Sequence, residues 1–452
     1  MKKYKLYFYG GAGAVTGANF LLEGEGIKIL VDCGLHQGST WSGQWNRQSF
    51  QYNPAEVDYL FVTHAHADHI GRIPKLVKDG FRGKIFSTHP TKDLAPVMFD
   101  DMTRLMARAA RERNQDPMYD EKDVSLAMSL WESFSYHETL NLKPFQIMAM
   151  NAGHILGSAM YEFDSGAAKI VFTGDLGNSP SVLLPDTESV TSASYMVMES
   201  VYGNRNHEGK ERRGEQLKSI LQQIARENGT LIMPVFSLER TQVFLHEINS
   251  FVEKGEVGGV SVFLDSPLAI KITHVYKKYS SYFKEEVRHE IERDDIFDFP
   301  KLRLTTGVED SAAIKRVKGA KVILAGSGMS DGGRVVEHLK NYLEDSAAVL
   351  LFTGYQAPGT TGRLLQDGVG RVEIQNRFYE VKMKRITLSG YSSHKDSEGL
   401  ERFASEGADS LRALFLAMGE PSAAGHLAQK LRDNHGINAI VPELGYVADI
   451  EL

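Results

Sequence analysis

The feature that most constrains this chain is a cluster of metal-ligand side chains in residues 62–71. His64, His66, Asp68 and His69 directly follow the apolar run 59–62, which predicts a buried strand. Burying three imidazoles and a carboxylate without partners costs several kcal/mol, and a bound cation offsets that cost. The pattern therefore predicts a metal site at the end of a strand.

The spacing of the four side chains indicates two ions rather than one. Residues i and i+2 of an extended segment face the same side, so His64 and His66 can bind one ion. Asp68 and His69 lie beyond the strand end, where the chain must turn, and can reach a second ion nearby. Two neighbouring ions are typical of metal-assisted hydrolysis.

Length and composition predict two large domains of a globular protein. The chain has 452 residues, 42% apolar and 24% charged. No apolar stretch approaches the roughly 20 residues of a membrane span, and the N-terminus lacks the apolar region of a signal peptide. Cys33 is the only cysteine, which excludes a disulfide framework and a thiolate zinc site. A reducing, cytoplasmic location is the expectation.

The net charge of −7 and the pI near 6.1 argue against a tight, non-specific coat on long nucleic acid. They leave room for an enzyme that contacts a few phosphates through a local groove.

The order of strand and helix patterns predicts an α/β fold. Strands are expected at 5–9, 19–23 and 27–32, a helical segment at 93–135, and further strands at 146–150, 160–163, 169–173 and 195–198. Four apolar strands then begin near residues 230, 261, 321 and 348, and helices such as 240–252 and 333–343 follow them. This alternation predicts a parallel sheet with helices on its faces. The tail repeats it with strands at 385–388 and 414–417 and helices from 397 and 422.

More ligand-type side chains stand at predicted strand ends, namely Asp32, His154, Asp175, Glu199 and His394. Carboxylates and imidazoles gathered at one end of a sheet predict an active site. Considered alone, His154 and Asp175 are better explained as structural turn residues, because Gly-Asp turns are common. The cluster at 64–69 favours the functional interpretation.

The string His64–His69, with His154 and Asp175, resembles the metallo-β-lactamase superfamily. Segments 198–205, 265–269, 326–333 and 390–394 are similar to its β-CASP branch, which includes the nuclease subunit of the pre-mRNA 3′-end cleavage machinery, the ribonuclease J enzymes and shorter bacterial and archaeal homologues. The resemblance covers nearly the whole chain. It implies an αββα sandwich formed by residues 1–205 and 380–452, with a β-CASP domain inserted at 206–379.

The resemblance also implies a role for each site residue. The first zinc is expected on His64, His66 and His154, the second on Asp68 and His69, and Asp175 is expected to bridge them. Asp32 would accept a hydrogen bond from a ligand histidine. A metal-bound hydroxide would attack the phosphorus, His394 would protonate the leaving oxygen as general acid, and Glu199 would orient it.

One position departs from the family pattern. The family places a histidine on the second zinc in an apolar–His-Gly-Glu context, and here that context reads Leu416-Ala-Met418-Gly419-Glu420. A thioether is a soft ligand that suits a hard two-zinc site poorly. The second ion is therefore expected to bind more weakly or to be absent, and manganese could replace zinc.

The resulting function hypothesis is a metal-dependent ribonuclease acting on single-stranded RNA in a cleft beneath the β-CASP domain. Two alternatives stay open: an RNA-binding or regulatory homologue with little turnover, and a hydrolase of a small phosphodiester or ester. The candidates for phosphate binding are Ser327, Gly328 and Ser392, although a tight strand–helix turn explains 326–333 equally well. A homodimer and the absence of a membrane partner are further expectations.

Overall fold

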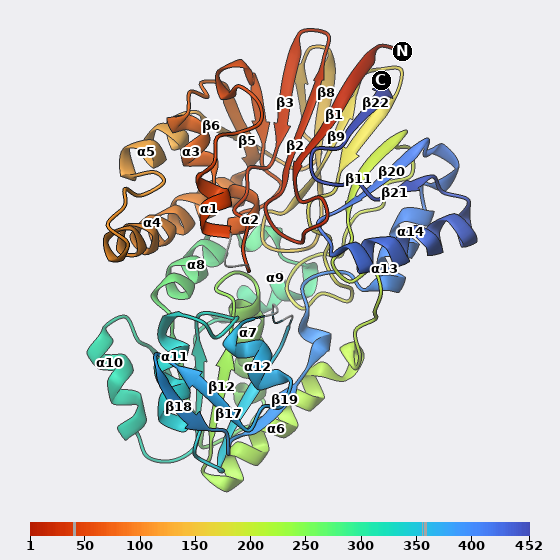
Figure 1. The fold of residues 1–452 in the computed structure, drawn as a ribbon. Coiled ribbons are helices and arrows are strands. Elements are labelled where there is room, and N and C mark those ends of the chain that lie inside the picture. Colours follow the sequence, from red (N-terminus) through yellow and green to blue (C-terminus); the bar gives the residue numbers. More distant parts are fainter. Residues whose placement is uncertain (39–41, 355, 357–358) are drawn as a thin grey trace. The chain divides into compact units, whose positions relative to one another are not determined.

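The computed structural model describes residues 1–38, 42–354, 356 and 359–452. The chain folds into two compact units (Figure 1). The first comprises Met1–Asn206 and His394–Leu452, and the second comprises His207–Ser393.

The first unit contains two seven-stranded sheets. The strands of the first sheet, in spatial order, are β22 (Val447–Glu451), β1 (Lys3–Gly10), β2 (Asn19–Gly24), β3 (Ile27–Val31), β4 (Tyr59–Phe61), β5 (Lys84–Thr88) and β6 (Trp131–Phe134). Those of the second are β21 (Ala439–Ile440), β20 (Ala413–Ala417), β11 (Tyr195–Glu199), β10 (Lys169–Phe172), β9 (Ala159–Asp164), β8 (Phe145–Asn151) and β7 (Thr139–Leu142).

The helices of the first unit lie on the outer faces of the two sheets, except for two short helices at 42–47 and 67–70 that lie near the ends of the strands (Figure 1). They are α1 (Ser42–Arg47), α2 (Ala67–Ile70), α3 (Ile73–Lys78), α4 (His89–Glu112), α5 (Glu121–Ser129), α13 (Ser397–Ser405) and α14 (Pro421–His435). The helical segment expected at 93–135 is correct for most of α4 and for α5 but wrong at its end. There β6 pairs in parallel with β5 and buries Trp131 and Phe134.

The main core of this unit is aromatic and lies between the two sheets. Phe8 and Phe61 come from the first sheet, and Phe163, Phe172 and Phe415 from the second. Alternation along β1, in which Tyr4, Leu6 and Phe8 are buried and their neighbours are not, is the period-two pattern of a strand with one covered face. The predicted αββα sandwich is confirmed.

The second unit is built on a six-stranded parallel sheet. Its strands, in spatial order, are β14 (Leu302–Leu304), β13 (Ser261–Asp265), β15 (Lys321–Ala325), β12 (Thr230–Pro234), β16 (Ala348–Phe352) and β19 (Lys384–Thr387). Every residue of β12, β15 and β16 is buried, as expected for parallel strands covered on both faces. A small antiparallel pair, β17 (Arg371–Ile374) and β18 (Arg377–Glu380), follows.

The helices of the second unit are α6 (Arg213–Glu227), α7 (Arg240–Glu253), α8 (Pro267–Lys278), α9 (Glu285–Ile291), α10 (Val308–Ala313), α11 (Gly333–Tyr342) and α12 (Thr361–Gln366). The predicted parallel sheet with helices is confirmed. One assignment differs: the sequence analysis placed the strand at 385–388 with the C-terminal segment, beyond a boundary at 379/380. Instead β19 pairs in register with β16, because Val349 to Phe352 offer it an open edge.

The candidate site residues of the first unit lie at the carboxyl ends of parallel strands in both sheets. Asp32 follows β3, and Thr63 and His64 follow β4, the parallel neighbour of β3. In the second sheet Asp175 follows β10, Glu199 ends β11 and Met418 follows β20, and these three strands are also mutually parallel. Loops at the carboxyl ends of such strands are where ligand sites form.

Candidate metal centre

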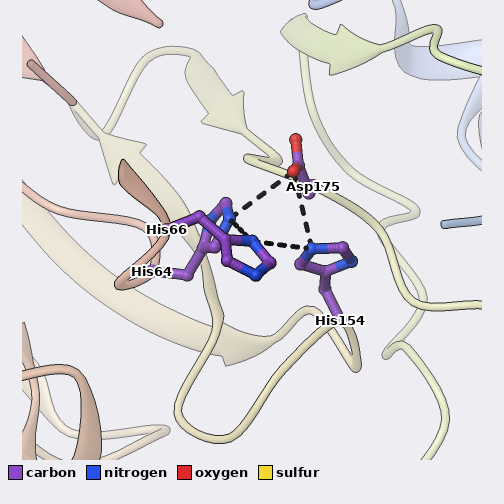
Figure 2. Close-up of side chains that lie close together, drawn as sticks. All are labelled: His64, His66, His154 and Asp175. Carbon is purple, nitrogen blue, oxygen red and sulfur yellow. Dashed lines mark hydrogen bonds and ion pairs between the residues drawn. The ribbon is translucent and has the colours of Figure 1, made fainter. Parts of the chain in front are cut away.

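Four side chains converge on one point in the first unit (Figure 2). His64 Nε2 lies 3.0 Å from His66 Nδ1, and His154 Nε2 lies 3.3 Å from the same atom. Oδ2 of Asp175 is 3.5 Å from His64 Nε2 and 3.5 Å from His154 Nε2. The sequence analysis assigned these four residues to the first ion, and the fold brings all of them together.

The chemistry of this group fits a cation. Burial, together with nearby His69, holds the pKa of His64 well below its usual range, so its imidazole is neutral. At least one of the two facing nitrogens, His64 Nε2 and His66 Nδ1, presents a lone pair to the other. Three imidazole nitrogens and a carboxylate oxygen at these separations form a ligand set that suits zinc.

A second group uses the other oxygen of the same carboxylate. Oδ1 of Asp175 lies 3.5 Å from Nε2 of His69. That nitrogen is buried and has no hydrogen-bond partner among the described residues. Burial alone would lower the pKa of His69, but the carboxylates of Asp175 and Asp32 outweigh it and hold this pKa well above its usual range. A cation beside Nε2 would replace the proton that these carboxylates favour.

Asp68, the other expected ligand of the second ion, lies in the first turn of α2 and is half-buried. Burial raises the pKa of its carboxyl, and neighbouring Asp175 raises it further, whereas His69 lowers it. Among the described residues, two sets of side chains have ligand atoms that all lie within 4.8 Å of one another: His64, His66, His154 and Asp175, and Asp175, Glu199 and His394. Neither set contains Asp68 or His69. The place of Asp68 on the second ion therefore stays a prediction.

The loop that carries these ligands is held by Asp32. Its Oδ1 accepts the backbone N–H of Thr63 at 2.8 Å, and its Oδ2 accepts the Thr63 hydroxyl at 2.8 Å and His69 Nδ1 at 2.7 Å. The carboxylate thereby fixes which nitrogen of His69 carries the proton. The sequence analysis expected this kind of role for Asp32 but missed Thr63, because a lone threonine carries no distinguishing pattern.

His394 and Glu199 form a pair beside Asp175. Nδ1 of His394 is 3.2 Å from Glu199 Oε1 and 4.0 Å from Asp175 Oδ2. Glu199 is fully buried, and its Oε1 also accepts the N–H of Leu176 at 2.6 Å. Burial would lower the pKa of His394, but Glu199 and Asp175 outweigh it and raise this pKa. The pair can therefore hold a proton on His394.

Lys395, which the sequence analysis did not single out, holds the His394 segment in place. Its Nζ donates to the carbonyl of Gly177 at 2.8 Å, and its backbone N–H donates to Leu176 O at 2.9 Å. Both acceptors lie in the loop that carries Asp175. No sequence pattern distinguishes this lysine from those on the surface.

Met418 directly follows β20. It lies next to the end of β11, because Ala417 of β20 pairs with Glu199 of β11. Its side chain is 1% exposed and belongs to the core between the sheets. Its backbone is left-handed, with φ 49°, and its N–H donates to Gly11 O at 2.5 Å. Met418, which the sequence analysis placed at a ligand position of the family pattern, therefore packs as a core side chain.

The predicted phosphate-binding residues lie in the second unit. Ser327 and Gly328 follow β15, where the Ser327 hydroxyl donates to Gly332 O at 3.4 Å and a Cβ on Gly328 would lie 2.7 Å from the Phe236 ring. Ser392 is buried and its N–H donates to Ser389 O at 3.1 Å. These contacts account for the loop as a tight turn, and a phosphate-binding role stays a prediction.

This fold, with its histidine and aspartate cluster at one sheet edge, defines a metal-dependent hydrolase of the metallo-β-lactamase type. Three family models match the chain: a metallo-β-lactamase superfamily domain over residues 21–201, a β-CASP domain over 241–365 and a Zn-dependent metallo-hydrolase RNA specificity domain over 379–442. The chain belongs to the β-CASP family of the metallo-β-lactamase superfamily. This membership confirms the predicted family and the predicted enzyme class, a metal-dependent nuclease.

Curated relatives align over most of the chain. Ribonuclease TTHA0252 of Thermus thermophilus is 32% identical, over 87% of this chain and 88% of that protein. Transcription termination factor FttA of Methanosarcina mazei is 28% identical, over 93% of this chain and 68% of that protein. Cleavage and polyadenylation specificity factor 73 of Drosophila melanogaster is 29% identical, over 87% of this chain and 57% of that protein.

Among solved structures, a protein of unknown function from Enterococcus faecalis shares the fold. The TM-score is 0.60 at 12% identity, with 99% of this chain and 100% of that chain covered. In the part of the chain that the structure describes, no helix has the length and apolar character needed to cross a membrane.

Proposed function

We propose that this protein is a metal-dependent ribonuclease that cleaves single-stranded RNA. The observation that carries the proposal is the sharing of Asp175: one carboxylate faces His64 and His154 through Oδ2, faces His69 through Oδ1 and lies beside His394. RNA as the substrate is supported by the matched RNA specificity domain and by the relatives named as a ribonuclease and as a cleavage factor.

We assign the metal ligands as the family resemblance implies. His64, His66, His154 and Asp175 would hold the first zinc, and Asp68, His69 and Asp175 the second. When bound, such ions activate water and neutralise charge on a phosphodiester. With Met418 in the core, the second ion has fewer ligands from the chain than the first, so it should bind more weakly and exchange for manganese more readily.

His394 would act as the general acid. Its Nδ1 faces Glu199, and its Nε2 would deliver a proton to the leaving oxygen. Glu199 orients the ring and keeps it protonated, and Lys395 holds the His394 segment on the loop of Asp175. These roles need no group outside the first unit.

The test is cleavage of an end-labelled single-stranded RNA with added zinc or manganese. His64→Ala and His394→Ala should each reduce the rate by at least about 100-fold, the scale of a lost acid or metal ligand. His426→Ala is the matched control, since His426 is an exposed residue of α14, and should cleave normally. Unchanged cleavage by both active-site variants would assign the activity to another protein in the preparation.

A second candidate is favoured by Met418 alone: an RNA-binding or regulatory protein with little turnover. It predicts RNA binding that survives in His394→Ala and no cleavage by the parent protein with either metal. The hydrogen bond between buried Glu199 and half-buried His394 favours the enzyme, because a binding protein has no use for a positioned acid. A cytoplasmic location and a homodimer remain expectations for fractionation and light scattering to check.

A further inference from the structure

A cavity of the first unit lies outside the ligand cluster. It is lined by aromatic side chains, including Tyr9, Trp45, Phe50 and Tyr52, and by two buried polar residues, Asn19 and Arg72. Its volume is about 40 Å³, whereas a single water needs roughly 10–15 Å³. The cavity is therefore large enough for the edge of a planar ring.

Arg72 is the unexplained charge of this cavity. Its side chain is 6% exposed and takes part in no ion pair within the described part of the chain. One guanidinium nitrogen donates to Gln48 O at 3.2 Å, but Nε is buried without a hydrogen-bond partner. A buried guanidinium N–H without an acceptor is costly, so Nε needs an acceptor that the described residues do not supply.

Asn19 presents the opposite need in the same cavity. It is 3% exposed, and its amide nitrogen donates to Tyr52 Oη at 3.2 Å and to Asp32 O at 3.4 Å. Its Oδ1 is buried and accepts no hydrogen bond from the described residues. A ligand that completes the cavity must therefore accept from Arg72 and donate to Asn19.

The aromatic side chains form a continuous row that ends at the guanidinium of Arg72. Ring centroids are 5.4 Å apart for Tyr7 and Tyr9, which stack at 8°. They are 5.2 Å apart for Tyr9 and Tyr52, whose planes are tilted by 42°, and 5.3 Å apart for Tyr52 and Phe50, tilted by 37°. Arg72 Cζ then lies 4.3 Å from the Phe50 centroid. Aromatic and guanidinium planes in one row are the surfaces on which unpaired bases of single-stranded nucleic acid stack.

We infer that this cavity is a nucleobase subsite, with guanine as the base that fits it best. Guanine O6 and N7 both accept from a guanidinium, and its N1–H donates on the adjacent edge, which matches Arg72 and Asn19. The subsite lies next to the ligands, because Asn19 bonds to the backbone of Asp32 and the Asp32 carboxylate holds His69. The inference rests on the proposed ribonuclease function, since it assigns the base to the RNA substrate.

The experiment is calorimetric titration of the metal-loaded full chain with guanosine, adenosine, cytidine and uridine. Nucleosides carry no phosphate, so the readout is independent of the metal ligands and of cleavage. Guanosine should bind at one site, more tightly than the other three. Arg72→Lys keeps the charge but loses the planar fork, and should weaken guanosine binding about 10-fold or more.

Two further variants make the result interpretable. Arg104→Lys, the same change at an exposed position on α4, should leave binding unchanged. Phe50→Leu removes the ring beneath Arg72 and should also weaken binding, while thermal unfolding checks that each variant is folded. No guanosine binding by the parent chain, or equal binding by Arg72→Lys, would overturn the subsite, and equal binding of adenosine would overturn the choice of guanine.

Short oligonucleotides identify the source of the base. A uridine pentamer with one guanosine should bind more tightly than an all-uridine pentamer, and Arg72→Lys should abolish the difference. If Arg72→Lys weakens binding of free guanosine but not of the guanosine-containing pentamer, the cavity binds a small molecule. Its assignment to the RNA substrate is then wrong. If the chain cleaves no RNA but these dependences hold, the base subsite stands and the proposed ribonuclease function fails.

Discussion

Asp32 Oδ2 accepts a hydrogen bond from His69 Nδ1 at 2.7 Å, while the same carboxylate accepts both the backbone and the hydroxyl of Thr63. The strand end that carries the ligand loop is thus tied to one buried side chain. We expect Asp32→Asn to lower metal affinity 10- to 100-fold, because an amide nitrogen cannot accept from His69. Elemental analysis after dialysis measures this, and the exposed Asp449→Asn is the matched control. If Asp32→Asn retained its full metal content, the proposed role of Asp32 in orienting His69 for metal binding would be wrong.

Met418→His should strengthen binding of the second ion. Histidine tolerates the left-handed φ of 49° better than most residues, and the position directly follows Ala417, the strand partner of Glu199. Zinc per chain should rise towards two at concentrations where the parent chain holds fewer, as measured by elemental analysis. Met418→Leu keeps an apolar side chain and should not change the stoichiometry. Two tightly held zinc ions in the parent chain would contradict the proposal that the second ion binds more weakly than the first.

Glu199→Gln should shift the alkaline limb of the pH–rate profile to lower pH. Glu199 raises the pKa of His394, and removal of its charge lowers that pKa. Because His394 must be protonated to act as an acid, activity would be lost at a lower pH than in the parent chain. Rates measured between about pH 6 and pH 9 test this. The exposed Glu443→Gln should leave the profile in place.

Gly34→Ala should disrupt the ligand loop. A Cβ at Gly34 would lie 1.5 Å from Asp68 O and 2.7 Å from the backbone N of His69, so the backbone of the loop must move. We expect a loss of stability of about 2 kcal/mol or more together with loss of the second ion. Urea unfolding and metal content report the two effects. Gly258→Ala, where the added methyl meets nothing within 4 Å, is the control and should be near neutral.

Asp265 of β13 should make the second unit sensitive to acid. Burial alone would raise its pKa, but bonds from His338, Ser311, Thr305 and Arg334 outweigh burial and lower it to about 2. A depressed pKa stabilises the fold above the unfolded-state value near 4, and this stabilisation is lost as pH falls towards 2.

Asp265→Asn should therefore lower the free energy of unfolding by about 2 kcal/mol at pH 7. The difference from the parent chain should shrink between about pH 4 and pH 2. Urea unfolding at pH 7 and pH 3 checks both expectations. Asp298→Asn, at an exposed position of the same unit, should show neither effect. If the difference in free energy of unfolding between the parent chain and Asp265→Asn did not change with pH, the charge of Asp265 would not be the source of the stabilisation.

Much of the site could be predicted because its residues stand at strand ends in a dense local pattern. His64 to His69 identify the superfamily, and Asp175 and His154 then follow from it. Thr63, Lys395 and Arg72 could not be found, because their roles depend on backbone carbonyls and carboxylates that approach only after folding. The edge position of β19 was missed for the same reason, since its partner β16 precedes it by some thirty residues.

The order of the two units along the chain has a consequence for synthesis on the ribosome. Residues 207–393 are contiguous and can begin to fold as soon as they emerge. The first unit lacks β20, β22 and His394 until residues 394–452 follow, a delay of several seconds at about 5–20 residues per second. During that interval β11 and β1 each expose a pairing edge, so the nascent chain should be most dependent on chaperones, and most prone to aggregate, until residues 394–452 have emerged.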